Sequence, residues 1–204
     1  MDAEIDDAAL MIRYGQGDLA AFEQLYARHK GPLYRYLLRQ CWPRDAAADV
    51  FQEVWSRVIA NRERYAVRAT FRTWLYTIAQ SCVVDHYRLR ERKRADRMDS
   101  VDDHVDALAG QAHLQPEAEA AQSQLDRAFH AALERLPEEQ RNAFLLFEES
   151  GLSLKEIAAV TGVPQETVKS RLRYALAKLR AALAPDFDVV SATAMAGART
   201  GMET

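Results

Sequence analysis

A dense group of positively charged side chains closes the segment FRTWLYTIAQSCVVDHYRLRERKR, residues 71 to 94. The cations are opposed only by Glu91 and Asp96, and they are Arg88, Arg90, Arg92, Lys93, Arg94 and Arg97. Cations near the carboxyl end of a helix are favourable in any protein, which explains one or two of them. A larger group at one helix end is typical of a surface that binds phosphate, so we interpret it as a nucleic-acid contact.

A polar face precedes these cations on the same helix. Helical spacing places on it the side chains Tyr76, Thr77, Gln80, Ser81, Asp85 and Arg88. With the edge of Trp74 and the loop NRERYAVRAT at residues 61 to 70, this face could contact unstacked bases, because aromatic rings bind splayed single strands. For Trp74 itself we expect a core position, since tryptophan is usually largely buried.

Residues 153 to 180, SLKEIAAVTGVPQETVKSRLRYALAKLR, carry the most specific pattern in the chain. Ser153 and Glu156 form a capping box at the start of a short helix. Gly162 then supplies a tight turn, and Pro164 opens a longer basic helix. Each part also occurs in ordinary helical hairpins, but the ordered combination is that of a helix-turn-helix.

The second helix of such a motif enters the major groove of DNA with its first residues toward the base edges. The side chains that we expect to contact bases or phosphates there are Gln165, Glu166, Thr167, Lys169, Ser170, Arg173 and Tyr174.

Catalytic and metal-binding patterns are missing from the sequence. It has no Gly-rich phosphate loop and no nucleophile elbow. The histidines are scattered, and we interpret each of them as a surface or partly packed residue: His29, His86, His104, His113 and His130. Cys41 and Cys82 match no paired spacing and fall on apolar helical faces, so we expect buried thiols. We therefore expect a protein that is not an enzyme and has no catalytic residue, metal or cofactor.

Apolar residues at helical spacing predict the elements that must position these side chains. One helix runs from Asp18, its N-cap, to Gln40, and Gly31-Pro32 is expected to break or kink it. Asp45 would cap a second helix, and Thr70 would cap the helix that carries the polar face and the cations. No β-type alternation of useful length occurs, so the sequence predicts an all-α fold.

The charge distribution predicts two helical domains. Residues 98 to 126 contain no Lys or Arg, although the net charge of the whole chain is only -3. We interpret residues 98–116 as an acidic flexible linker between a helical bundle at 8–97 and a helix-turn-helix domain at 117–184. Residues 185–204 are small, polar and poorly periodic, so we expect a disordered tail.

The composition is that of a globular protein, because 49% of the 204 residues are hydrophobic and 28% are charged. No apolar run approaches the ~20 residues needed to cross a bilayer. The acidic N-terminus lacks the apolar region of an export signal. We therefore expect a cytoplasmic protein without membrane insertion.

Several segments, in this order, resemble the extracytoplasmic-function (ECF) sigma factors, the compact group of the bacterial sigma-70 family. They are DVFQEVWSRV, FRTWLYTIAQSCVVDHYR and LPEEQRNAFLLFEESGLSLKEIAAVTGVPQETVKSRLRYALAKLR. The likeness extends over about residues 10 to 183. It implies an alternative sigma factor that binds core RNA polymerase and directs promoter recognition and transcription initiation. Sigma region 2 would occupy residues 8–97, and sigma region 4 would occupy residues 117–184.

The resemblance also implies roles for particular side chains. The helix with DVFQEVW would dock on the β′ clamp helices of the polymerase through Asp49, Gln52, Glu53 and Arg57. The loop 61–70 and the next helix would recognise and melt the −10 element through Asn61, Arg64, Tyr65, Arg72, Tyr76, Gln80, Ser81, Asp85 and Arg88. The helix-turn-helix would read the −35 element. The other implied partners are the polymerase β subunit, promoter DNA and an anti-sigma factor.

The chain departs from the family pattern at Ser81, where many members have Asn, and this bears on its −10 preference. The alternative interpretation is a helix-turn-helix repressor or activator that is not a sigma subunit. Such a protein would need a sensor pocket or a dimerisation face, and it would not need the DVFQEVW and FRTWLYTIA segments.

Overall fold

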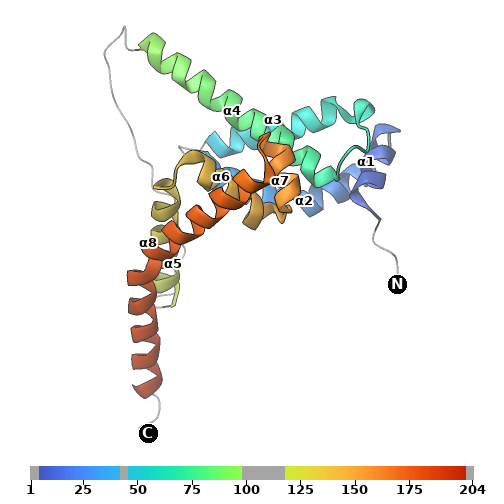
Figure 1. Cartoon of the computed structure of the whole chain (residues 1–204). Coiled ribbons are helices and arrows are strands. Elements are labelled where there is room, and N and C mark those ends of the chain that lie inside the picture. Colours follow the sequence, from blue (N-terminus) through green and yellow to red (C-terminus); the bar gives the residue numbers. More distant parts are fainter. Residues whose placement is uncertain (1–4, 42–45, 98–117, 201–204) are drawn as a thin grey trace.

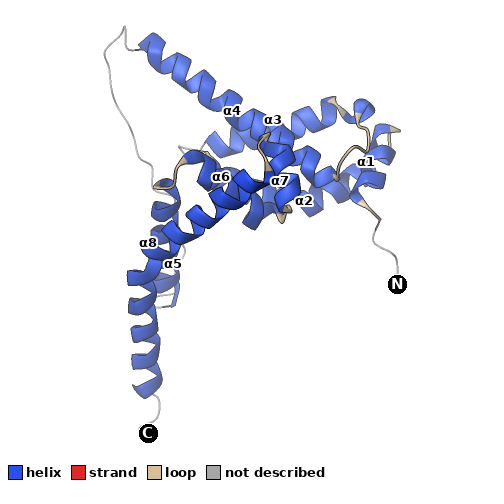
Figure 2. Ribbon diagram, in the orientation of Figure 1, coloured by secondary structure: helices blue, strands red, loops and turns tan. Residues whose placement is uncertain are grey.

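The computed structural model describes residues 5–41, 46–97 and 118–200, with side chains over 5–41, 46–92 and 126–184. Every regular element in these ranges is helical (Figure 2). The helices form two groups that follow one another along the chain, α1 to α4 and α5 to α8 (Figure 1). The predicted all-α fold with two small helical domains is therefore confirmed.

The first group consists of α1 (Asp7–Gly15), α2 (Leu19–Gln40), α3 (Ala46–Ala60), the short 3-10 helix η1 (Arg62–Arg64) and α4 (Phe71–Arg97). Asp18 caps α2, because its Oδ1 accepts a hydrogen bond from the backbone nitrogen of Ala21 at 3.2 Å. Thr70 caps α4, because its Oγ1 accepts a hydrogen bond from the backbone nitrogen of Thr73 at 3.2 Å. Both predicted caps are confirmed, while Asp45 lies outside the described residues.

α2 is one continuous helix through Gly31 and Pro32, so the predicted break at this point is wrong. A proline inside a helix removes one backbone hydrogen bond and crowds the preceding turn. His29 and Leu33, on either side of the Gly-Pro pair, are both buried in the core. We attribute the continuity of the helix to this packing, which fixes both halves against the same neighbours.

The core of the first group is rich in aromatic rings that join α2 to α3. The ring of Trp55 lies 4.9 Å from that of Tyr26 and 5.8 Å from that of Phe22. Such edge-on pairs add to the free energy gained by burying the rings. They fix α3 by its apolar side, which leaves its polar side facing outward.

The second group consists of α5 (Ala118–Glu134), α6 (Glu138–Ser150), α7 (Leu154–Thr161) and α8 (Gln165–Thr200). Gly151 and Gly162 end α6 and α7 with φ angles of 63° and 69°, a left-handed conformation that glycine adopts without strain. The capping box of Ser153 and Glu156 is present at the start of α7. Together α7, the Gly162 turn and α8 form the predicted helix-turn-helix.

α8 continues to Thr200, although the sequence predicts a disordered tail from residue 185. That prediction depended on the missing apolar periodicity. Residues 181–200 are rich in alanine, which has the highest intrinsic helix propensity and needs no apolar stripe. The predicted linker 98–116 and the side chains of Lys93, Arg94 and Arg97 lie outside the described parts of the chain.

The two groups pack directly against each other. α2 lies against α6, and α4 lies against α7 (Figure 1). This packing was not predicted from the sequence, which indicated only two domains and a tether. No helix in the described ranges is long and apolar enough to cross a membrane.

Candidate polymerase and nucleic-acid interfaces

The solvent-facing side of α8 carries the side chains predicted to contact the −35 element. Its opposite side is buried against the second group through Val168, Leu172, Ala175 and Leu179. The exposed predicted residues are Gln165, Glu166, Lys169, Arg173 and Tyr174, and the half-buried ones are Thr167 and Ser170. The first turns of α8 therefore present one continuous polar surface.

Two cations on this surface are available for phosphate or base contacts. Lys169 lies 3.9 Å from the carboxylate of Glu166, and both side chains are more than half exposed, at 67% and 83%. An exposed pair of this kind contributes little to stability, so Lys169 can exchange Glu166 for a phosphate. The Arg173 guanidinium lies over the Tyr174 ring, 5.1 Å from its centroid, and both side chains are exposed.

A groove between α3 and α4 gathers most of the residues predicted to bind polymerase. It encloses about 330 Å³ and is lined by Asp49, Val50, Glu53, Arg57, Cys82, Asp85, His86 and Leu89. The fourth predicted residue, Gln52, is exposed on α3. The groove is acidic at its rim and has Leu89 as an exposed apolar side chain at one end.

Arg57 joins the two walls of this groove. Its Nε donates a hydrogen bond to Glu53 at 2.7 Å, and its Nη2 donates to Asp85 at 3.0 Å. Asp85, predicted for the −10 contact, therefore shares a surface with the predicted polymerase-binding residues. The structure brings these two predicted sets together at this point.

The loop before α4 positions an aromatic side chain beside a second cavity. The Tyr65 ring lies 5.0 Å from that of Trp74 and 6.3 Å from that of Phe71. Burial raises the pKa of Tyr65, and its hydroxyl has no hydrogen-bond partner among the described residues. Asn61 is less available, because its side-chain amide donates to the carbonyl of Arg57 at 2.8 Å.

The cavity beside this loop encloses about 380 Å³. It is lined by Arg64, Ala66, Arg68, Ala69, Thr73, Trp74, Thr77 and Ala159. Cations, hydroxyls and an indole ring are the groups that can hold an unstacked base. Ala159 belongs to α7, so the second helical group forms one wall of the cavity.

Tyr76 is not on the exposed face of α4, so its predicted exposed position is wrong. Its side chain is 1% exposed, and its ring meets that of Tyr36 edge-on at 5.3 Å. The first half of α4 packs on the first helical group and on α6 and α7, so several of its faces are covered. Tyr76 cannot contact DNA in this arrangement.

Among the other predicted −10 residues, some side chains are exposed to solvent and others are partly buried. Arg72, Ser81 and Arg88 are exposed, whereas Gln80 is half-buried and its Oε1 lies 3.1 Å from the Tyr36 hydroxyl. Trp74 is half-buried and packs against the core, as expected.

Polar contacts connect the two helical groups. Glu149 of α6 accepts a hydrogen bond from Arg35 at 2.8 Å and pairs also with Arg39, and its side chain is only 7% exposed. The Tyr36 hydroxyl lies 3.0 Å from Oδ1 of the buried Asn142. These contacts were missed from the sequence, because isolated Arg, Glu and Asn residues at these positions form no recognisable motif.

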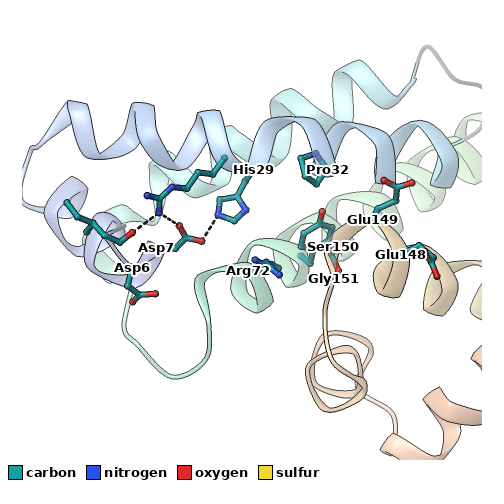
Figure 3. A pocket seen from close by; sticks show the side chains of 12 residues that line it. Asp6, Asp7, His29, Pro32, Arg72, Glu148, Glu149, Ser150 and Gly151 are labelled. Atoms are coloured by element: carbon teal, nitrogen blue, oxygen red, sulfur yellow. Dashed lines mark hydrogen bonds and ion pairs between the residues drawn. The ribbon is translucent and has the colours of Figure 1, made fainter. Parts of the chain in front are cut away.

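A larger cavity, about 700 Å³, lies where α1, α2, α4 and α6 meet (Figure 3). On one side, Arg28 donates to Asp7 at 2.8 Å, and His29 Nε2 lies 2.7 Å from Asp7 Oδ2. Burial lowers the pKa of His29 more than Asp7 raises it, so the ring is neutral at pH 7 and its Nε2–H donates. On the other side, Arg72 approaches Gly151 (Figure 3). The cavity is lined by both acidic and basic side chains, which indicates an interface between helices rather than a site for one ion.

Comparison with known proteins agrees with this division of the chain. The family model for sigma-70 region 2 matches residues 25–93, and that for sigma-70 region 4 matches residues 126–179. The chain is 32% identical over 180 residues to the ECF RNA polymerase sigma-E factor of Haemophilus influenzae, covering 84% of this chain and 92% of that protein.

Two solved structures share the fold. One is the sigma factor RpoE in complex with the anti-sigma factor NepR from Bartonella quintana, with a TM-score of 0.64 and 25% identity over 79% of this chain and 96% of that one. The other is CnrH in complex with the cytosolic domain of CnrY, with a TM-score of 0.63 and 27% identity over 88% of this chain and 98% of that one. From the two regions, their order and these relatives, we conclude that the chain belongs to the ECF sigma factors of the sigma-70 family, alternative sigma factors that direct transcription initiation by RNA polymerase.

Proposed function

We propose that α3 docks on core RNA polymerase while α4 and α8 contact promoter DNA. The observation that carries this proposal is the presence of separate exposed polar surfaces, one on each helical group. Asp49, Gln52 and Glu53 face solvent on α3, and the first turns of α8 face solvent on the second group. In both helices the apolar side is already used in the core, so the polar side remains for a partner.

The polymerase contact assigned to α3 is with the β′ clamp helices. The groove between α3 and α4 supports it, because acidic rims and one exposed Leu89 suit a partner helix with both basic and apolar side chains. Arg57 would position Glu53 for this contact, since it already fixes that carboxylate. The second group would contact the β subunit.

The loop 61–70 and α4 are assigned to the −10 element. The cavity beside Trp74 would receive an unstacked base, with Arg64 at its rim and Tyr65 packed behind it. Arg72, Ser81 and Arg88 would contact the strands. Asn61 and Gln80, whose amides are engaged within the protein, would support the loop and the helix.

The first turns of α8 are assigned to the −35 element. Gln165 and Arg173 have the donors and acceptors that base edges in a major groove require, and Lys169 suits phosphate. The likeness to RpoE in complex with NepR also supports an anti-sigma partner for this chain. Since a sigma subunit acts on RNA polymerase, we assign it to the cytoplasm, without a catalytic role of its own.

Capture of core RNA polymerase by the full chain tests the function. We expect stable association, weakened by Glu53→Lys or by Gln52→Ala, because both residues lie on the outer side of α3. The matched control is Glu23→Lys, which makes the same charge change at an exposed position of α2.

The circular dichroism spectrum of each variant should be unchanged, which separates loss of contact from loss of fold. If core affinity is unaffected by both α3 variants, this face is not the docking site. Binding to a palindromic site as a dimer, without polymerase, would instead support the repressor or activator alternative.

A further inference from the structure

The cavity of about 700 Å³ where α1, α2, α4 and α6 meet is large enough for a small molecule (Figure 3). Most of the charged side chains that line it are engaged within the protein. Asp7 is bound by Arg28 and His29, and the Glu149 carboxylate pairs with two arginines of α2. Asp6 is the N-cap of α1. These charges are compensated by neighbouring groups, so they leave little for a bound molecule.

Arg72 and Glu148 are the two charged lining residues that remain. Both are exposed, and neither has a hydrogen bond or an ion pair with another residue that the structure describes. Nη1 of Arg72 lies 3.3 Å from the point where a Cβ on Gly151 would be. Glu148 lies three residues before Gly151, in the last turn of α6. The cavity therefore has one cation and one anion on neighbouring parts of its wall, and they are not paired with each other.

The helices that carry these two residues contribute opposite ends to the wall. Arg72 is the second residue of α4, whereas Glu148 is in the last turn of α6. The start of a helix carries a partial positive charge, because its first N–H groups have no partner within the helix, and its end carries a partial negative charge. An anionic group is therefore favoured beside Arg72, and a cationic group is favoured beside Glu148.

The Tyr76 hydroxyl gives a second, independent indication of a ligand. Tyr76 lines the cavity four residues after Arg72, is 1% exposed, and its hydroxyl has no hydrogen-bond partner within the described ranges. Burial raises the pKa of Tyr76, so the hydroxyl keeps its proton and can donate, while the Arg72 charge opposes this shift. A buried hydroxyl without a partner is unfavourable. An oxygen atom held by Arg72 would give it one.

We propose that this cavity binds a small zwitterion, an aliphatic amino acid whose carboxylate is held by Arg72 and the Tyr76 hydroxyl and whose ammonium group is held by Glu148. The mixed charges of the lining do not suit a single ion, but they match a molecule that carries both signs. Ile5 and Pro32 add apolar surface for the aliphatic part. This site goes beyond the proposed function and does not depend on it. Of its ligand-binding residues, only Arg72 is also assigned to the −10 element.

Isothermal titration calorimetry of the full chain tests the class of ligand. The probes are free glycine, γ-aminobutyrate and ε-aminocaproate, which place the two charges at increasing separation. Butyrate and butylamine are the matched compounds with a single charge. We expect one of the amino acids to bind about tenfold or more tightly than either of these, because it makes both charged contacts. The affinity should pass through a maximum at one chain length, since α4 and α6 fix the separation of Arg72 and Glu148.

Two charge-removing variants test the contacts. Arg72→Gln and Glu148→Gln should each weaken binding of the best amino acid by about tenfold or more, since each removes one charged contact. Arg180→Gln and Glu23→Gln make the same substitutions at exposed positions of α8 and α2, and both should bind like the wild type. Circular dichroism spectra of all four variants show whether the fold is retained.

Tyr76→Phe separates ligand binding from packing. Without ligand, this variant should be as stable as the wild type or more stable, because it removes a buried hydroxyl that has no partner. Its affinity for the amino acid should nevertheless fall by about tenfold, because a hydrogen bond to the carboxylate is lost. A purely structural hydroxyl would give the opposite pair of results, a lower Tm and an unchanged Kd.

Three results would overturn the proposal. One is an amino acid series that binds no more tightly than the single-charge compounds, and another is an affinity that does not vary with chain length. The third is wild-type affinity in both Arg72→Gln and Glu148→Gln, which would place the ligand elsewhere. All of these measurements use the free chain without polymerase or DNA, so they leave the proposed function untouched. Failure to bind core polymerase would in turn count only against that function.

Discussion

Glu156 shows how a side chain with a recognisable local role can have a second role that the local pattern does not reveal. Burial alone would raise the pKa of its carboxyl. Hydrogen bonds from the Ser153 backbone and hydroxyl, and then from Thr70 and Thr73, outweigh burial and lower the pKa from 4.5 to about 2. The charged form is therefore the one that the folded chain stabilises.

The acid sensitivity of the chain should reflect this carboxyl. Because its folded pKa is below its unfolded pKa, its contribution to stability is complete above pH 4.5 and is lost as the pH falls toward 2. Glu156→Gln keeps a capping-box residue but does not titrate. Urea unfolding at several pH values should show a steeper loss of stability for the wild type within this window. Parallel curves for the two proteins would show that Glu156 does not carry this effect.

The DNA contacts proposed for Lys169 and Arg173 can be of two kinds, and these can be distinguished by experiment. A cation that contacts a phosphate contributes to binding of all DNA sequences. Its replacement by Ala should therefore weaken DNA binding uniformly and reduce the slope of log affinity against log salt concentration by about one unit. If the cation contacts a guanine edge, its replacement by Ala should cost about 1–3 kcal/mol of binding free energy and relax the preference at one base position. Promoter binding by each Ala variant in holoenzyme, over a range of salt, measures both quantities. A double variant with normal binding and normal salt dependence would exclude both roles.

At the scale of elements, the end of α1 fixes the start of the loop 61–70, which we proposed for the −10 element. A Cβ on Gly15 would lie 2.9 Å from the backbone oxygen of Arg62, at the start of η1. Real Cβ atoms do not approach a backbone oxygen so closely, so a larger residue must displace α1 or η1. Gly15 thus sets the distance between α1 and the loop that carries Arg64 and Tyr65.

Gly15→Ala should therefore destabilise the chain, although alanine is intrinsically the better helix former. Overpacking of this kind typically costs about 1–3 kcal/mol. Gly31→Ala is the matched control, because its Cβ would meet only the end of the Arg35 side chain, at 3.5 Å. That change should be neutral or stabilise α2 by up to about 1 kcal/mol. Urea unfolding of both variants gives the comparison, and equal effects would contradict the close approach at Gly15.

Several of the helices were predictable from the sequence because they have an apolar stripe and a capping residue, whereas α1 was not predicted. Asp18, Thr70 and the Ser153–Glu156 pair begin helices as predicted, and Gly151 and Gly162 end them. The surface of α8 was predictable for the same reason, since its buried stripe fixes which residues face outward. Periodicity also assigned α3 a polar side, and that side is exposed in the structure.

The sequence could not indicate which side of a helix is covered by a second neighbouring element of the same chain. Tyr76 has the spacing of an exposed residue on an isolated helix, but it is buried and its ring packs edge-on against that of Tyr36. Burial of that kind depends on contacts between residues far apart in the chain, such as Arg35 with Glu149. Continuity of α2 through Pro32 has a similar origin, because tertiary packing outweighs the local effect of proline.

For the whole molecule, the packing of region 2 on region 4 couples the stability of the two regions. Glu149 contributes through hydrogen bonds to charged partners, each typically about 1.5–3 kcal/mol. The net effect is smaller where a partner can be hydrated instead, as Arg35 can, since its side chain is 54% exposed. Removal of the Glu149 charge should therefore weaken the coupling without unfolding either region.

Calorimetry of the full chain can measure this coupling. We expect one thermal transition for the wild type, because the regions unfold together while they are packed. Glu149→Gln should broaden this transition or divide it into two. Glu148→Gln is the control, since Glu148 is the exposed neighbour of Glu149 and forms no ion pair with region 2 among the described residues. Separate transitions in the wild type would show that the regions are already independent.

The double use of Glu156 also constrains how this chain can change over generations. The capping box alone would accept Glu or Gln at this position. The hydroxyls of Thr70 and Thr73 favour the charged acceptor, although 86 residues separate Thr70 from Glu156. In a lineage that lost both hydroxyls, a charged acceptor would no longer be favoured at position 156. Glutamine would then be as acceptable there as glutamate. Substitutions at the three positions should therefore occur together, and descendants of this chain would record in their sequences a contact between regions that no local motif reveals.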